Sequence, residues 1–184
     1  MLTLSELEFE TRVMMIHAGG VGAAFDPIGM STMRKVLDSV IGQRLAVLEA
    51  DKLKAYLPEE GELERVLAAF TARLGGPPEV DRFLKVHDAD ASMLSAVLTR
   101  MLRTERMLEG KLKLKAQVSE SEAKNLQAER PELRGLSLPQ LRQRLFDERF
   151  KALTVAELAG LRKAGSVRLL GPFADRQSPD GGDR

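Results

Sequence analysis

Apolar residues recur at helical spacing along most of the chain. The clearest stripe runs from about residue 30 to residue 55, where an apolar side chain returns every three or four positions. Leu, Ala, Glu, Arg and Lys are frequent and β-branched residues are sparse, which also favours helices. The pattern therefore predicts a mainly α fold, with helices over residues 5–18, 30–55, 59–74, 80–86, 88–116, 119–131 and 137–165.

Several of these expected helices begin with a capping signal. In a capping box, a Ser or Thr side chain accepts a hydrogen bond from the backbone three residues later, and a Glu or Gln side chain there reaches back. The candidate pairs are Thr3 with Glu6 or Ser5 with Glu8, Ser119 with Glu122, and Ser137 with Gln140. Within the second expected helix, Gly42 either lowers stability or lets another helix approach closely.

The last part of the chain has a different pattern. Residues 166–170, with the sequence Ser-Val-Arg-Leu-Leu, are typical of a strand. A lone strand leaves its backbone groups unpaired, so we expect residues 167–170 to pair with residues 2–4. The two chain termini would then form one small β element. Residues 174–184 are polar, contain Pro and two Gly, and are expected to be disordered.

The composition excludes several classes of chemistry. The 184 residues contain no Cys, which rules out disulfides, thiol catalysis and thiolate metal sites. His17 and His87 lie far apart in the sequence and neither belongs to a metal-ligand pattern. The glycines at 19–22 follow an expected helix instead of a strand, so they fit a helix end better than a phosphate-binding loop. We therefore expect no catalytic residue, metal or cofactor, and no enzyme activity.

Charge gives a weaker indication of partners. The net charge is +1, so no overall field directs the protein to nucleic acid or to an acidic membrane, and no apolar run reaches the length of a membrane span. One expected helix is basic and carries Arg100, Arg103 and Arg106. It lacks the interleaved aromatic residues of a nucleic-acid surface. A solvated face, or a surface that attracts acidic polypeptides, fits this helix better.

Five segments, taken in order, carry a family resemblance. They are residues 2–7 (LTLSEL), 36–45 (VLDSVIGQRL) followed by Glu49 and Ala50, 118–123 (VSESEA), 141–150 (LRQRLFDERF) and 161–170 (LRKAGSVRLL). This order resembles the first helix, the second helix, the element after the long central helix, and the closing helix and strand of the SurA-type periplasmic chaperones. The resemblance covers about residues 2–171.

The resemblance implies a function without a catalytic group. It implies an ATP-independent, periplasmic chaperone that binds unfolded or partly folded exported polypeptides, including outer-membrane proteins. The family's parvulin-type prolyl isomerase domain would need ~100 residues. Residues 117–135 occupy its place here, so we expect no isomerase activity. No segment of this chain has the pattern of a signal peptide, and the periplasmic location is implied by the resemblance alone.

The implied organisation has four parts. Residues 1–116 form a helical chaperone region, and residues 117–136 form a linker and short helix in place of the isomerase domain. Residues 137–171 form a closing helix and strand that pack on the first region, and residues 172–184 form a disordered tail. The linker lets the closing helix pack on its own domain or on a second copy, so a homodimer formed by element swapping is also expected.

We place the client surface on the inner faces of the long helices, where flexible Met side chains can adapt to different sequences. The candidate peptide-binding residues are Met33, Val36, Leu37, Val40, Phe70, Phe83, Met93, Val97 and Met101, and the candidate electrostatic residues are Arg100, Arg103 and Arg106. Most of these apolar positions fit a core role equally well, and for any single residue the core role is favoured. The competing functions are a helical scaffold or adaptor that binds one defined protein partner and, less favoured, an isomerase or other enzyme.

Overall fold

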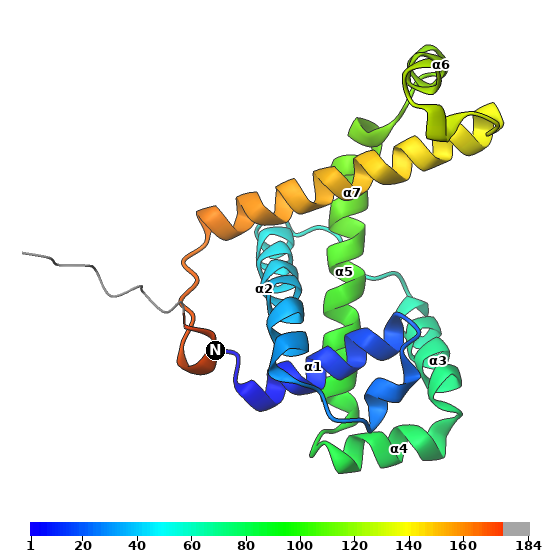
Figure 1. Cartoon of the computed structure of the whole chain (residues 1–184). Coiled ribbons are helices and arrows are strands. Elements are labelled where there is room, and N and C mark those ends of the chain that lie inside the picture. The colour runs from blue at the N-terminus through cyan, green and yellow to red at the C-terminus, as the bar shows by residue number, and fades with distance from the viewer. Residues whose placement is uncertain (175–184) are drawn as a thin grey trace, which may run out of the picture.

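The computed structural model describes residues 1–174, and every regular element in that part of the chain is helical (Figure 1). The α-helices are α1 (Leu4–His17), α2 (Met30–Lys52), α3 (Glu62–Leu74), α4 (Pro77–Val86), α5 (Ala91–Ala116), α6 (Glu120–Glu129) and α7 (Leu138–Ala164). Three short 3-10 helices are η1 (Val21–Ala24), η2 (Pro131–Leu133) and η3 (Gly171–Phe173). The predicted mainly α fold is confirmed, and each expected helix lies within a few residues of an observed one.

Local signals set the helix boundaries. At α1 the Thr3 hydroxyl accepts a hydrogen bond from the Glu6 amide, and the Glu6 carboxylate accepts one from the Thr3 amide at 2.7 Å. The Thr3 box therefore forms, and Ser5 lies inside the helix. At α7 the Gln140 side chain accepts a hydrogen bond from the Ser137 amide at 3.0 Å. These bonds satisfy amides that the first turn of a helix leaves without a partner.

Most of the chain forms a helical body, residues 4–116, with two hydrophobic cores. The first core lies between α1, η1, α3, α4 and α5, and its largest buried side chains are Phe9, Phe70, Phe83, Ile16, Leu94 and Leu98. The second core lies between α1, α2 and the end of the described chain. It consists of Leu7, Met33, Leu37, Val40, Ile41 and Phe173.

Helix α7 crosses both α2 and α5 (Figure 1). At the crossing with α2, a Cβ atom on Gly42 would stand 3.4 Å from each terminal methyl of Leu158. The absence of a side chain on Gly42 therefore allows α7 to lie close to α2, as one of the two sequence interpretations proposed. In this structure α7 packs on helices of its own chain.

The first half of α7 extends beyond the body and carries α6 and η2 (Figure 1). We call residues 118–145 the arm. It has a third, separate core of small size, made of Val118, Ala123, Leu133, Leu141 and Leu145. The arm is therefore a helical hairpin that buries its own apolar residues instead of those of the body.

The predicted strand is wrong. Residues 1–174 contain no strand, and residues 166–170 form no backbone hydrogen bond with residues 2–4. The two segments do lie together, because Leu2 and Leu169 pack on the same second core. Pairing fails because α1 begins at Leu4 and its cap uses the Thr3 amide, while the Thr3 carbonyl accepts from Leu7. The tail expected to be disordered lies, from residue 175 onward, outside the described residues.

Candidate functional site

Most of the sequence-predicted peptide-binding residues are inside the protein. Met33, Leu37 and Val40 are buried in the second core, and Phe70, Phe83 and Val97 are buried in the first. Val36 packs half-buried on the second core, and Met93 and Met101 pack half-buried on the first. The nine residues therefore do not share one surface, and in this conformation the six buried ones are core positions. A role of the three half-buried residues in binding stays a prediction.

The three candidate electrostatic residues are paired within the fold. Each forms an ion pair with an acidic residue of another segment: Arg100 with Glu10 (2.5 Å), Arg103 with Asp51 (2.6 Å) and Arg106 with Glu62 (2.6 Å). These pairs join α5 to α1, α2 and α3. The basic charge that the sequence shows on this helix is thus largely neutralised at these positions, which favours a structural role over attraction of acidic polypeptides.

The Glu10 carboxylate lies at the centre of a buried ion cluster. Its side chain is 4% exposed and pairs with both Arg44, at 2.7 Å, and Arg100. Burial lowers the pKa of Arg100, and the Glu10 charge opposes this shift. Because each of the three groups comes from a different helix, the cluster fixes α1, α2 and α5 to one another. The cluster therefore has a structural role, and of its three members only Arg44 lines one of the pockets described here.

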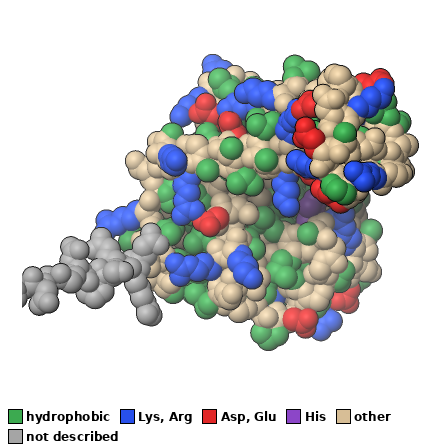
Figure 2. Space-filling view, turned by 45° about the horizontal axis from the view of Figure 1, so that its top comes forward, with side chains coloured by type: hydrophobic (Ala, Val, Ile, Leu, Met, Phe, Trp, Pro, Cys, Tyr) green, Lys and Arg blue, Asp and Glu red, His purple; other side chains and the backbone are tan. Residues whose placement is uncertain are grey.

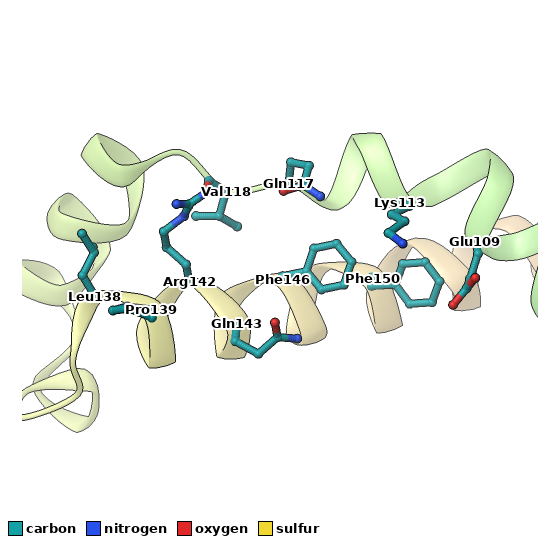
Figure 3. A pocket seen from close by; sticks show the side chains of 10 residues that line it. All are labelled: Glu109, Lys113, Gln117, Val118, Leu138, Pro139, Arg142, Gln143, Phe146 and Phe150. Atoms are coloured by element: carbon teal, nitrogen blue, oxygen red, sulfur yellow. The ribbon is translucent and has the colours of Figure 1, made fainter.

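A large pocket among the described residues lies where the arm leaves the body (Figure 3). It is an open groove of about 700 Å³ between the end of α5, the linker at residues 117–118 and the first half of α7. Phe146 and Phe150 project into it from one face of α7, with stacked rings whose centroids are 5.8 Å apart. We call it the arm groove; it is lined by Glu109, Lys113, Gln117, Val118, Leu138, Pro139, Arg142, Gln143, Phe146 and Phe150.

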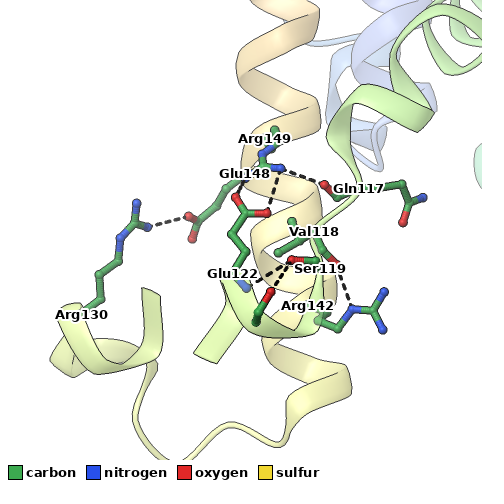
Figure 4. A network of polar contacts seen from close by, with 9 residues as sticks. Gln117, Val118, Ser119, Glu122, Arg130, Arg142, Glu148 and Arg149 are labelled. Carbon is green, nitrogen blue, oxygen red and sulfur yellow. Dashed lines mark hydrogen bonds and ion pairs between the residues drawn. The ribbon is translucent and has the colours of Figure 1, made fainter. Parts of the chain in front are cut away.

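The two walls of the arm groove are tied together by polar contacts (Figure 4). Arg149 of α7 donates a hydrogen bond to the Gln117 carbonyl at 2.8 Å and forms an ion pair with Glu122 of α6. Arg142 donates from Nε to the Val118 carbonyl at 3.0 Å. The linker that forms one wall is therefore held on α7 at two points.

The same network anchors α6. Ser119 accepts a hydrogen bond from the Glu122 amide, which confirms the capping position predicted there. The Glu122 carboxylate does not reach back to Ser119, as a full capping box would require, but pairs with Arg149. The hydrogen bond from Arg149 holds the pKa of Glu122 below its ordinary value of 4.5. The arm thus depends partly on a surface carboxylate that is ionised at neutral pH.

The arm groove is mixed in character, with aromatic and aliphatic side chains on its floor and both signs of charge on its rim. Glu109 and Lys113 stand at one end, and Arg142 and Gln143 stand between Phe146 and the other end (Figure 3). The face in Figure 2 shows hydrophobic side chains in small groups between Lys and Arg side chains. Such a surface suits contact with a flexible polypeptide more than the close fit of a small cofactor.

Residues 1–174 contain neither a cluster of metal ligands nor a membrane-spanning helix. No group of three or more His, Cys, Asp or Glu side chains in this range could hold a metal ion. None of the helices described is long and apolar enough to cross a membrane. His17 lines a small cavity of about 280 Å³ between α2, α5 and α7, where burial lowers its pKa, and His87 hydrogen bonds to the Ala24 carbonyl at 2.7 Å.

The sequence interpretation did not single out Phe146 and Phe150, although both belong to the apolar stripe of α7. A signal was present: Leu141 and Leu145 complete the stripe of the arm core, and the two Phe residues, four apart, stand beside it.

Comparison of the chain with protein-family models, curated proteins and solved structures found no match. The resemblance to the SurA-type chaperones therefore rests on the sequence segments alone.

Proposed function

We propose that this chain is an ATP-independent chaperone that binds unfolded or partly folded exported polypeptides in the periplasm and has no prolyl isomerase activity. Two lines of support meet in this proposal. One is the resemblance of residues 2–171 to the SurA-type chaperones. The other, which carries the proposal, is the arm groove: an open groove with a stacked pair of Phe side chains, whose linker wall is held on α7 by polar contacts.

The groove has the physical properties that a holdase needs. Phe146 and Phe150 are half-buried, so each still offers ring surface to a bound chain. Burial of apolar surface stabilises a complex by about 25 cal/mol per Å² and requires no particular sequence. The rim carries amide, cationic and anionic side chains, which can pair with the backbone and charges of many segments. The groove is therefore suited to weak binding of varied polypeptides.

The decisive experiment removes one aromatic ring without disturbing a core. Phe146 lines the arm groove and no other pocket described here, whereas Phe150 also packs towards the body. In Phe146→Gln we expect aggregation suppression to fall several-fold, while the free energy of unfolding changes by about 1 kcal/mol or less because the ring is only partly buried. The matched control is Val155→Gln on the same helix, at a position 63% exposed and outside the groove.

The assay uses two unrelated unfolded polypeptides, one of them an unfolded outer-membrane β-barrel protein, without nucleotide. A chaperone suppresses aggregation of both, and Phe146→Gln weakens both while Val155→Gln weakens neither. If Phe146→Gln retains full activity, the arm groove is not the client site. Binding of a single defined partner, with no effect on either unfolded polypeptide, would favour the scaffold or adaptor function. A rate enhancement in a proline-peptide assay would overturn the expected lack of isomerase activity.

A further inference from the structure

A second apolar pocket lies where the chain start meets the end of the described chain, near the N label of Figure 1. It has a volume of about 480 Å³. Its floor is formed by buried side chains of α1 and α2, including Leu7, Leu37 and Ile41. Residues 1–4 form one side and residues 166–170 form another. We call it the terminal pocket.

Residues 166–170 run along this pocket as an extended segment with open backbone groups. The backbone is extended at Gly165, just before the segment (φ −89° and ψ 143°), and at Leu170, its last residue (φ −129° and ψ 163°). Among residues 1–174, no backbone–backbone hydrogen bond involves an amide or carbonyl of residues 166–169, and Leu170 is the N-cap of η3. A row of unpaired groups on an extended segment is the template on which another strand can add.

One side chain of the segment packs on the core. Leu169 is half-buried and packs on the second core, whereas its neighbours Arg168 and Leu170 are exposed. Leu170 is 62% exposed, and Leu48, which lines the pocket from α2, is 57% exposed. The pocket thus has an apolar floor and an apolar rim that the described chain leaves uncovered.

The charges of the terminal pocket restrict what can cover it. Its charged lining side chains are Arg44 and Arg168, and no acidic side chain lines it. Arg44 is already paired with Glu10, but Arg168 is exposed and appears in no ion pair among the described residues. A second copy that added its own segment antiparallel, centred on Arg168, would oppose two like charges, which is unfavourable. An acidic residue opposite Arg168 would be favourable.

We propose that residues 166–170 bind an extended segment of another protein by β-strand addition. The segment alternates apolar side chains, which cover the terminal pocket, with polar ones, and carries an acidic residue opposite Arg168. This site is separate from the arm groove and does not depend on the proposed chaperone function, because an adaptor protein could use it equally. At this site the backbone of residues 166–170 binds the partner, whereas in the arm groove side chains bind it.

The test uses a short fluorescein-labelled peptide of alternating Val and Thr with one central Glu. Two further copies carry N-methyl groups on every second backbone nitrogen, in one copy on the odd positions and in the other on the even positions. An added strand uses the amides of one edge alone. One methylated copy should therefore bind at least about tenfold more weakly than the parent peptide, and the other should bind like it.

Variants of the protein test the same backbone hydrogen bonds by removing amides of residues 166–170 instead of amides of the peptide. Successive amides of a strand point to opposite edges, so we compare Val167→Pro with Val167→Ala, and Arg168→Pro with Arg168→Ala. One of the two Pro variants should bind the peptide at least about tenfold more weakly than its Ala control.

Replacing the peptide Glu by Lys should weaken binding to the wild type more than binding to Arg168→Ala. Phe146→Gln should bind the peptide normally.

Each result decides the proposal. Equal binding of all three peptides, or of each Pro variant and its Ala control, would overturn strand addition. Circular dichroism of every variant shows whether it folds, and the methylated peptides test the unmodified protein in any case. If the wild type alone sediments as a dimer that one of the two Pro variants dissociates, the occupant is a second copy and the proposed partner is wrong. If the peptide does not bind but the protein still suppresses aggregation, strand addition at residues 166–170 is overturned and the proposed function of the arm groove stands.

Discussion

The body and the arm use similar helices in opposite ways. In the body, the apolar stripes of α1, α2 and α5 face one another, and residues such as Phe70 and Phe83 are completely buried. In the arm, the core is small and the neighbouring Phe146 and Phe150 remain at the edge of a groove. The comparison shows that part of an apolar stripe stays at the surface where too few neighbouring helices pack on it.

The two regions also differ in how charge holds them. The body contains Glu10 between two Arg side chains, and Glu10 is almost inaccessible to solvent. The arm is attached through Arg149 with Glu122 and through Arg130 with Glu148, and these side chains are partly exposed. Buried ion pairs are costly to break, whereas exposed pairs contribute little each. The body should therefore unfold as a unit, and the arm should detach more easily.

The largest expected effect comes from breaking the buried ion cluster of the body. In Glu10→Gln, Arg44 and Arg100 lose their counter-charge and face each other in a buried site. We expect the free energy of unfolding to fall by about 3–5 kcal/mol, measured by urea denaturation. The matched control is Glu49→Gln, which removes an exposed ion pair with Lys52 and should cost less than about 1 kcal/mol. Equal effects would mean that burial does not distinguish the two pairs.

A second prediction concerns the independence of the arm. Leu141 is fully buried in the arm core, so Leu141→Ala should cost about 2–5 kcal/mol of local stability. Hydrogen exchange should show loss of amide protection in α6 while the amides of α1 and the first half of α5 stay protected. Leu114→Ala, at a position 84% exposed near the end of α5, should change neither. Simultaneous loss of protection throughout the chain would show that body and arm form one cooperative unit.

The smallest expected effect is a pH dependence of the arm. Because Arg149 lowers the pKa of Glu122 below 4.5, the folded arm favours the ionised carboxylate. The stabilisation is complete above the unfolded pKa and is lost as pH falls through the lower folded pKa, so α6 should lose protection as the pH falls below 4.5. In Glu122→Gln this dependence should become flatter, while Glu129→Gln serves as the exposed control. An unchanged profile in Glu122→Gln would assign the dependence to other carboxylates.

Much of the local structure could be predicted from the sequence, because its causes lie within a few residues of each other. The helical spacing of apolar residues and the capping signals located the α-helices of the described residues, and the boxes at Thr3 and Ser137 marked two of their starts. The capping Ser119 was found in the same way. Such signals act through hydrogen bonds between residues three apart, so they need no knowledge of the remaining chain.

The candidate site could not be predicted in the same way. An apolar stripe shows that a helix has a face to cover, but not which helix covers it. Met33 and Phe83 were therefore placed on a client surface, although α1 and its neighbours bury them, while Phe146 of the arm was left out. The Arg100 charge was assigned to the surface for the same reason, since its partner Glu10 lies ninety positions away in the chain.

The sequence by itself determined the helices, their caps and the exclusion of cysteine chemistry. The tertiary structure decided which apolar faces are covered, which charges are paired, and that residues 166–170 lie extended beside residues 1–4 without forming a sheet with them. The physical reason is that helix formation depends on neighbours within one turn, whereas burial, ion pairing and strand addition depend on segments that only folding brings together.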